Sequence, residues 1–166
     1  MTPLKHRIYR AVSKACSIRP GEPRGLRTLL YHSVGTVLEE DPYGTSISAE
    51  LFEAHLRSLC ALKDRFEFVP FSAPADPRAR VALTFDDGYA DILKTAPLLA
   101  EKSIPFTVFA ATDLIRAGRA PYLNEEGLKE LSRVPGASIG SHGKTHIPLV
   151  RLTATGLAAE LRSSRR

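Results

Sequence analysis

This sequence of 166 residues contains only two cysteines and no long apolar run. Its two cysteines, Cys16 and Cys60, are too few for a disulfide framework and do not form a CxxC metal motif. No apolar run approaches the roughly 20 residues that cross a bilayer. The N-terminus also lacks the apolar core and the small-residue cleavage site of a secretory signal. These absences favour a cytoplasmic globular protein whose two thiols are reduced.

Positive charge exceeds negative charge only modestly. The 23 lysines and arginines stand against 18 aspartates and glutamates, which gives a formal net charge of +5. Much of this excess lies near the two ends of the chain, and between the ends the charge is close to balance. A nucleic-acid-binding domain carries its basic residues on one face or stripe of the fold. We therefore expect no nucleic-acid partner.

The first 25 residues are interpreted as a basic N-terminal helix and a linker. Leu4, Ile8 and Val12 recur at helical spacing, with basic side chains between them. Residues 20–25 are rich in proline and glycine, which is typical of a connecting segment. Two roles stay open for the helix. We favour packing on its own domain over peripheral contact with an anionic membrane surface.

Strand-like and helix-like segments alternate along the rest of the chain. The predicted strands are residues 26–31, 66–71, 81–85, 104–110 and 137–140, and the predicted helices begin at Ser48, after residue 88, at Asn124 and at Thr153. Such alternation predicts an α/β fold with mainly parallel strands. Functional side chains collect at the carboxyl ends of the strands in folds of this class.

A first motif, Thr-Phe-Asp-Asp-Gly at residues 84–88, closes the apolar strand 81–85. Neighbouring side chains on a regular strand point to opposite faces. Asp86 and Asp87 can therefore serve one centre only if the chain bends there, and Gly88 permits that bend. Aspartate and glycine are also common turn residues, so this motif alone leaves a purely structural role open.

A second motif, Ser-His-Gly-Lys-Thr-His at residues 141–146, follows the strand 137–140. One carboxylate and two imidazoles can bind a divalent metal while leaving positions open for water and substrate. The second carboxylate then remains free to act as a base. Because both motifs follow strands and both contain a glycine, we favour a metal-dependent hydrolase over two unrelated turns.

These two motifs resemble those of the NodB-homology polysaccharide deacetylases, carbohydrate esterase family four. That family carries Thr-Phe-Asp-Asp-Gly followed by Ser/Thr-His-x-x-x-His, and the resemblance runs from about Leu26 onward. It implies a domain at residues 26–166 that hydrolyses N-acetyl groups of amino-sugar polymers or glycoconjugates. It also implies that Asp87, His142 and His146 ligate a metal, usually zinc in this family, with Asp86 as the general base.

Two further residues near the motifs are assigned to substrate contact. His32 follows the strand 26–31, and a structural or substrate-contacting role is favoured over metal ligation because three ligands are already present. Tyr89, which directly follows the first motif, is given the same substrate-binding role. The sequence does not specify an oligomeric state.

The resemblance also implies groups that this sequence does not contain. The family adds an arginine that orients the base, a tryptophan in the substrate pocket and a late histidine that acts as general acid. This sequence has no tryptophan and no histidine after His146. We therefore expect a truncated domain, and an incomplete, distorted (β/α) barrel with an uncovered sheet edge. The alternative function is a catalytically impaired remnant that binds metal and carbohydrate.

Overall fold

The computed structural model describes residues 24–38, 41 and 44–164. The predicted N-terminal helix, most of its linker and Cys16 lie outside the described residues. The strands are β1 (Leu26–Tyr31), β2 (Glu67–Phe68), β3 (Arg80–Phe85), β4 (Phe106–Ala110) and β5 (Ala137–Ser141). The helices are α2 (Ala49–Cys60), α3 (Ile92–Glu101), α4 (Thr112–Ala117), α5 (Glu125–Leu131) and α6 (Ala154–Ser163), with short 3-10 turns η1 (Lys63–Arg65) and η2 (Leu149–Arg151).

All five strands form one parallel sheet, in the order β1-β3-β4-β5, with β2 also paired to β3. β1 runs beside β3 along its full length, from Leu26 opposite Arg80 to Tyr31 opposite Phe85. On the other side of β3, β2 pairs with its start and β4 with its end. This arrangement confirms the α/β class, and the sheet is open, as expected for an incomplete barrel.

Three helices begin where the sequence predicts, because each has a polar cap. The side chain of Ser48 accepts a hydrogen bond from Leu51 N at the start of α2. Asn124 caps α5 and Thr153 caps α6 in the same way. Each cap satisfies one of the amide groups that a helix start leaves without a partner.

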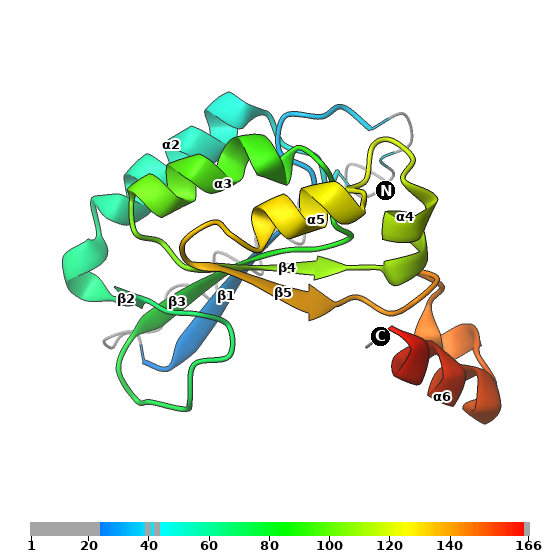
Figure 1. The fold of residues 1–166 in the computed structure, drawn as a ribbon. Coiled ribbons are helices and arrows are strands. Elements are labelled where there is room, and N and C mark those ends of the chain that lie inside the picture. The colour runs from blue at the N-terminus through cyan, green and yellow to red at the C-terminus, as the bar shows by residue number, and fades with distance from the viewer. Residues whose placement is uncertain (1–23, 39–40, 42–43, 165–166) are drawn as a thin grey trace, which may run out of the picture.

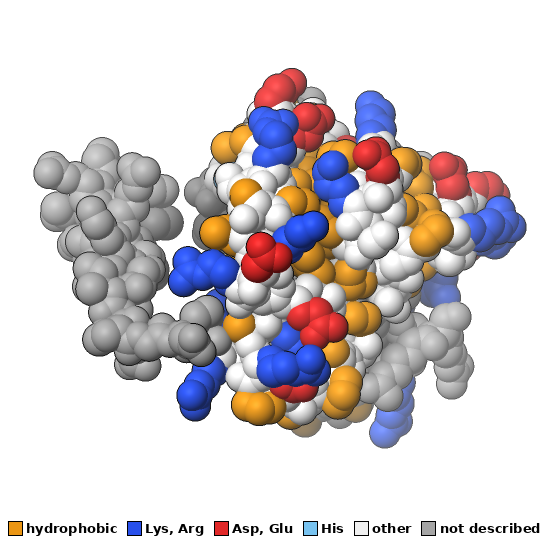
Figure 2. Space-filling view, turned by 90° about the vertical axis from the view of Figure 1, so that its left-hand side faces the viewer, with side chains coloured by type: hydrophobic (Ala, Val, Ile, Leu, Met, Phe, Trp, Pro, Cys, Tyr) orange, Lys and Arg blue, Asp and Glu red, His pale blue; other side chains and the backbone are white. Residues whose placement is uncertain are grey.

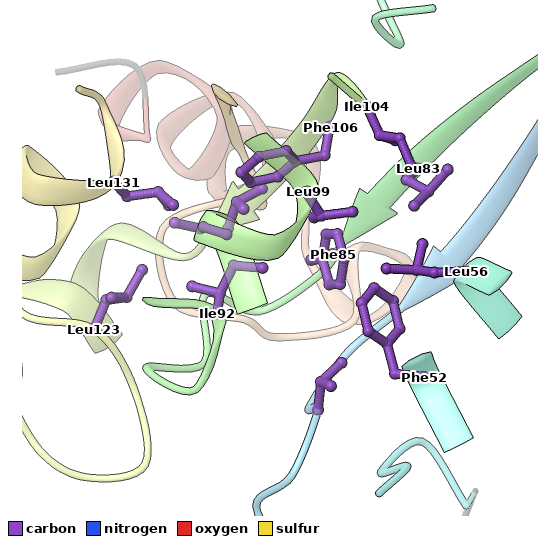
Figure 3. Close-up of a cluster of buried hydrophobic side chains, with 14 of the residues drawn as sticks. Phe52, Leu56, Leu83, Phe85, Ile92, Leu99, Ile104, Phe106, Leu123 and Leu131 are labelled. Atoms are coloured by element: carbon purple, nitrogen blue, oxygen red, sulfur yellow. The ribbon is translucent and has the colours of Figure 1, made fainter. Parts of the chain in front are cut away.

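Helices α2, α3 and α5 cover one face of the sheet, and the hydrophobic core lies between them and the strands (Figure 1). Phe52 and Leu56 of α2 are fully buried against this face. The ring of Phe52 packs edge-on against Phe85 of β3, whose ring in turn contacts Phe106 of β4 (Figure 3). The core thus joins the end of β3, where the first motif begins, to α2 and β4.

The other face of the sheet carries no helix within the described residues (Figure 1). The segment between β2 and β3 covers part of it, where Phe71 packs against Phe109 and the buried Arg80 donates to Pro74 O. Leu30 of β1 is 54% exposed on this face. At the outer edge, β5 leaves Ile139 40% exposed. Among the described residues, the sheet therefore has the uncovered edge that was expected, and Leu30 also lies exposed on its second face.

Three local expectations differ from the structure. The strand predicted at 66–71 is only the two-residue β2, because pairing with β3 ends after Val69 at Pro70, which cannot donate to a ladder. The helix predicted after residue 88 begins only at Ile92 and then continues through Pro97. α4 was not predicted, since six residues are too short to show a helical period.

The surface seen from the amino ends of the strands carries acidic and basic side chains interspersed with apolar ones (Figure 2). No histidine is visible on the described part of this face, which lies opposite the two motifs. None of the helices in the described residues has the length and apolar character needed to span a membrane.

A matched pair of leucine substitutions tests whether one sheet face is buried and the other open. Leu83→Ala on β3 removes a fully buried side chain from the helix-covered face and should lower the free energy of unfolding by about 2–5 kcal/mol. Leu30→Ala on β1, on the other face, should cost less than about 1 kcal/mol. Urea denaturation followed by circular dichroism measures both. Equal costs would mean that the second face is also covered in the protein.

Candidate functional site

The first motif bends sharply at the end of β3. Asp86 N donates to Tyr31 O at 2.9 Å, so the strand pairing extends one residue past Phe85. Asp87 then adopts φ 71° and Gly88 φ 75°, both in the left-handed region. This region costs energy for any residue other than glycine, although asparagine and aspartate enter it more readily than most. The bend brings the two adjacent carboxylates to one end of the sheet, as the sequence predicts.

Close packing holds the bend in place. A Cβ atom on Gly88 would lie 3.1 Å from Ala110 Cβ and 3.3 Å from Ile115 Cδ1, so a side chain here must push β4 or α4 away. Gly88 O accepts a hydrogen bond from Leu123 N at 2.8 Å. The glycine is thus required both by its backbone angle and by its neighbours.

The second motif crosses the end of β4 to reach the first. After β5 ends at Ser141, His142 N donates to Ala110 O at 2.9 Å, which directs the chain across the last residue of β4. Thr112 N and Asp113 N donate to Gly143 O and Lys144 O, which attaches this loop to the start of α4. The loop ends at His146, whose φ is 60°.

The structure brings Asp87, His142 and His146 together. Asp87 Oδ1 lies 2.8 Å from His146 Nε2 and 3.1 Å from His142 Nε2. One donor atom from each residue lies within 4.8 Å of the others, and no other set of three or more such residues is found in the described chain. Asp87 is nearly buried, while the side chains of His142 and His146 are 33% and 43% exposed. The group therefore has a protein side and a solvent side.

The donor set fits a divalent metal on geometric grounds. Asp87 Oδ1 is buried and, despite its two close nitrogen neighbours, has no aligned hydrogen-bond partner. Such an orphaned oxygen is costly in a folded protein unless something else satisfies it. A buried carboxylate oxygen beside two imidazole nitrogens, without an aligned hydrogen bond, is suited to share a cation with them. Two imidazoles and a carboxylate are also a common ligand set for catalytic zinc, with a position left open.

The two neighbouring aspartates differ in their electrostatics. Burial raises the pKa of Asp87, but contact with His142 and the charges of His146 and His32 outweigh it and leave that pKa lowered. The pKa of Asp86 is raised by burial, which the charges of His142 and His32 offset only in part. Asp86 Oδ2 lies 4.0 Å from His142 Nε2, so it adjoins the group of three without belonging to it.

The two residues predicted to contact substrate, His32 and Tyr89, have different surroundings in the structure. His32 is half-buried after β1, and its charge acts on both Asp86 and Asp87. Tyr89 is only 8% exposed, and its ring stacks on Tyr122 at 5.0 Å. Burial raises the pKa of Tyr89, so the hydroxyl stays protonated. A substrate-binding role for either residue stays a prediction, and Tyr89 has little free surface for one.

Two buried carboxylates outside the motifs were not found from the sequence. Asp91 directly precedes α3, and its Oδ2 accepts from Ser33 Oγ at 2.8 Å and Val34 N at 2.9 Å. It therefore ties the segment after His32 to the start of α3. Glu160 of α6 similarly accepts backbone bonds from the loop between His142 and His146. No sequence pattern indicates this burial, because an acidic residue on an amphipathic helix is normally solvated.

Comparison with protein families gives one match. Residues 73–166, more than half of the chain, match the model of the family described as polysaccharide deacetylase. Both motifs and every residue of the group of three lie inside this range. No curated protein sequence matches the chain.

Several solved structures share the fold. The Streptococcus pyogenes deacetylase PplD, solved in complex with acetate, superposes with a TM-score of 0.68 at 23% identity, over 86% of this chain and 66% of that one. IcaB from Ammonifex degensii superposes with a TM-score of 0.67 at 23% identity, over 86% of this chain and 67% of that one. A polysaccharide deacetylase from Bacillus cereus superposes with a TM-score of 0.68 at 21% identity, over 84% of this chain and 45% of that one. The chain thus spans roughly half to two thirds of these proteins' lengths.

Two glycine substitutions test whether the bend at the first motif is held by packing. Gly88→Ala should destabilise the protein by more than the roughly 1–2 kcal/mol that a left-handed alanine costs, because its Cβ also crowds Ala110 and Ile115. Gly25→Ala is the control, since Gly25 has φ 71° but no atom within 4 Å of a Cβ. Thermal unfolding of both variants measures the difference. If both cost the same, the close packing around Gly88 does not constrain the bend.

Proposed function

Since the chain belongs to the polysaccharide deacetylase family, we propose that it is a metal-dependent hydrolase that removes N-acetyl groups from an amino-sugar polymer or glycoconjugate. The observation that carries the proposal is the orphaned Asp87 Oδ1, which faces two imidazole nitrogens at 2.8 and 3.1 Å beside a second carboxylate. The solved deacetylases of the same fold support the reaction class.

In this proposal Asp87, His142 and His146 hold a divalent metal ion, for which we expect Zn²⁺. When bound, such an ion supplies a Lewis acid that polarises an acetamide carbonyl and makes water more acidic. Asp87 suits ligation because its lowered pKa keeps it ionised. The partly exposed faces of His142 and His146 leave the solvent side open to an incoming sugar.

Asp86 is proposed to act as the general base. Its raised pKa makes it a better proton acceptor than Asp87, and it adjoins the group of three. As the water oxygen bonds to the carbonyl carbon, Asp86 accepts the proton that the water loses. The carbon–nitrogen bond then breaks and acetate leaves, while the proton taken up by Asp86 passes to the sugar nitrogen, which becomes an amine. The chain needs no serine or cysteine nucleophile for this reaction.

A second function, a remnant that binds metal and carbohydrate without efficient turnover, is favoured by one observation. Within the described part of the chain, Asp86 forms no ion pair with an arginine or lysine, and His142 is its only charged partner. A base without a fixed partner is less well oriented for proton transfer. Acetate release separates the two functions, because both predict metal binding and only the first predicts hydrolysis.

Asp86→Asn tests the base directly. Acetate released from N-acetylglucosamine oligomers by the zinc-loaded protein should fall about 10²–10⁴-fold, because an amide cannot accept the proton. Zinc content, measured by atomic absorption, should stay at the wild-type level, since Asp86 is not one of the three ligands.

Asp64→Asn, an exposed substitution in η1, is the matched control and should leave the rate unchanged. Unchanged activity in the Asp86 variant would contradict its role as base. Zinc and sugar binding by the wild-type chain without any acetate release would favour the second function.

Zinc binding should also strengthen as pH rises. A metal must displace the proton that His142 holds, and the contact with Asp87 raises the pKa of His142 above 6.5. Proton competition therefore persists at pH values where an ordinary histidine is already neutral. We expect the dissociation constant for Zn²⁺, measured by chelator competition, to fall steadily between about pH 6 and about pH 8. A constant value over that range would argue against ligation by His142.

A further inference from the structure

Glu160 is a buried carboxylate on a helix that is otherwise largely exposed. It is 6% exposed, whereas the next residue, Leu161, is 47% exposed. α6 lies at the outside of the molecule, beyond the end of β5 (Figure 1). A buried carboxylate is tolerated only where hydrogen bonds replace its lost water. The partners of Glu160 therefore indicate why an acidic residue occupies this position.

All of these partners belong to the loop between the two histidines. Glu160 Oε1 accepts from Lys144 N at 2.7 Å, Thr145 N at 2.6 Å and Thr145 Oγ1 at 3.0 Å. Thr145 Oγ1 also lies 3.1 Å from Glu160 Oε2. Hydrogen bonds to an ionised carboxylate are about twice as strong as neutral ones. These donors lower the pKa of Glu160, which keeps it ionised.

On the side that faces α6, Glu160 supplies the hydrogen bonds that hold the loop 143–145 among the described residues. Its opposite side is attached to the start of α4 through the carbonyl groups of Gly143 and Lys144. The amide groups of Lys144 and Thr145 have Glu160 as their acceptor. Without that carboxylate, α4 would still hold the loop carbonyls, but the peptide leading into His146 would lose its anchor.

The hydrogen bonds to Glu160 matter because the backbone at His146 is strained. His146 has φ 60°, a conformation that costs about 1–3 kcal/mol and persists only when its surroundings enforce it. The hydrogen bonds to Glu160 reach as far as Thr145, the residue directly before His146. Gly143 has φ 83°, and a Cβ there would lie 3.1 Å from Glu160 Oε1. The loop thus approaches the carboxylate as closely as its backbone allows.

We propose that Glu160 is a positioning residue, which holds the loop 143–145 so that His142 and His146 both face Asp87. This inference rests on the proposed function, because its main consequence is metal affinity. Glu160 does not belong to the group of three and acts only through the loop backbone. The rival explanation is that Glu160 merely fastens α6 to the domain.

Glu160→Ala tests the proposal through two readouts. In the metal-free protein, hydrogen exchange at the Lys144 and Thr145 amides should accelerate about tenfold or more, because their acceptor is gone. In chelator competition, the dissociation constants for Zn²⁺ and Co²⁺ should rise about 10–100-fold. The visible absorption of the Co²⁺ form should also change, since it reports ligand geometry. Fastening of α6 alone predicts neither the loss of affinity nor the spectral change.

Three further variants keep the test decisive. Glu160→Gln retains an acceptor oxygen and should restore part of the affinity. Thr145→Val removes only the hydroxyl contacts and leaves α6 intact, so a smaller rise in the dissociation constant is expected even if Glu160→Ala unfolds. Arg162→Ala, an exposed substitution on the same helix, is the matched control and should bind metal like the wild type.

The failures of the two proposals are distinguishable. Wild-type protein that binds neither ion would contradict the proposed function, while amide exchange in the metal-free variants would still decide whether Glu160 holds the loop. Wild-type protein that binds metal, with Glu160→Ala binding equally well and exchanging no faster, would overturn the role of Glu160.

Discussion

The candidate site depends on the parallel alignment of β3, β4 and β5. Asp87 follows β3 and His142 follows β5, so a whole strand separates the two segments. Two strand spacings amount to about 10 Å, yet Asp87 Oδ1 and His142 Nε2 lie 3.1 Å apart. The chain closes this gap because the β5 end crosses over Ala110, the last residue of β4, through the bond from His142 N. Any shift in strand register would move the imidazoles away from the carboxylate.

Closing the gap requires unfavourable backbone conformations at the functional residues themselves. Only three non-glycine residues in the described chain have positive φ, and two of them are Asp87 and His146. Each must be enforced by its neighbours. The packing of Gly88 against β4 and α4 enforces the first, and the proposed anchor at Glu160 enforces the second. The first constraint comes from β4 and α4 and the second from α6, so the loop between the two histidines is held by α4 on one side and by α6 on the other.

The sequence allowed the fold class to be predicted from local patterns, whereas the choice of Asp87, His142 and His146 as one group came from the resemblance of the two motifs to a known family. Alternating apolar segments indicate parallel strands, and carboxyl ends of such strands meet at one edge. What could not be predicted depends on contacts between distant segments. An acidic residue on an amphipathic helix is normally solvated, so the burial of Glu160 follows only once the loop is known to lie against α6. The burial of Tyr89 likewise depends on Tyr122, whose segment carries no regular pattern.

Two adjacent aspartates acquire different chemistry from their positions alone. Asp87 lies between two imidazoles, whose attraction exceeds the effect of burial and lowers its pKa. Asp86 has a single imidazole at 4.0 Å, and burial dominates, so its pKa is raised. The two residues are adjacent in the chain, but the bend at Asp87 and Gly88 gives them different surroundings. Asp87 is therefore suited to stay ionised as a ligand, and Asp86 is suited to accept a proton. The bend thus does more than bring the side chains together: it gives identical groups different proton affinities, which is the condition for dividing ligation from base catalysis.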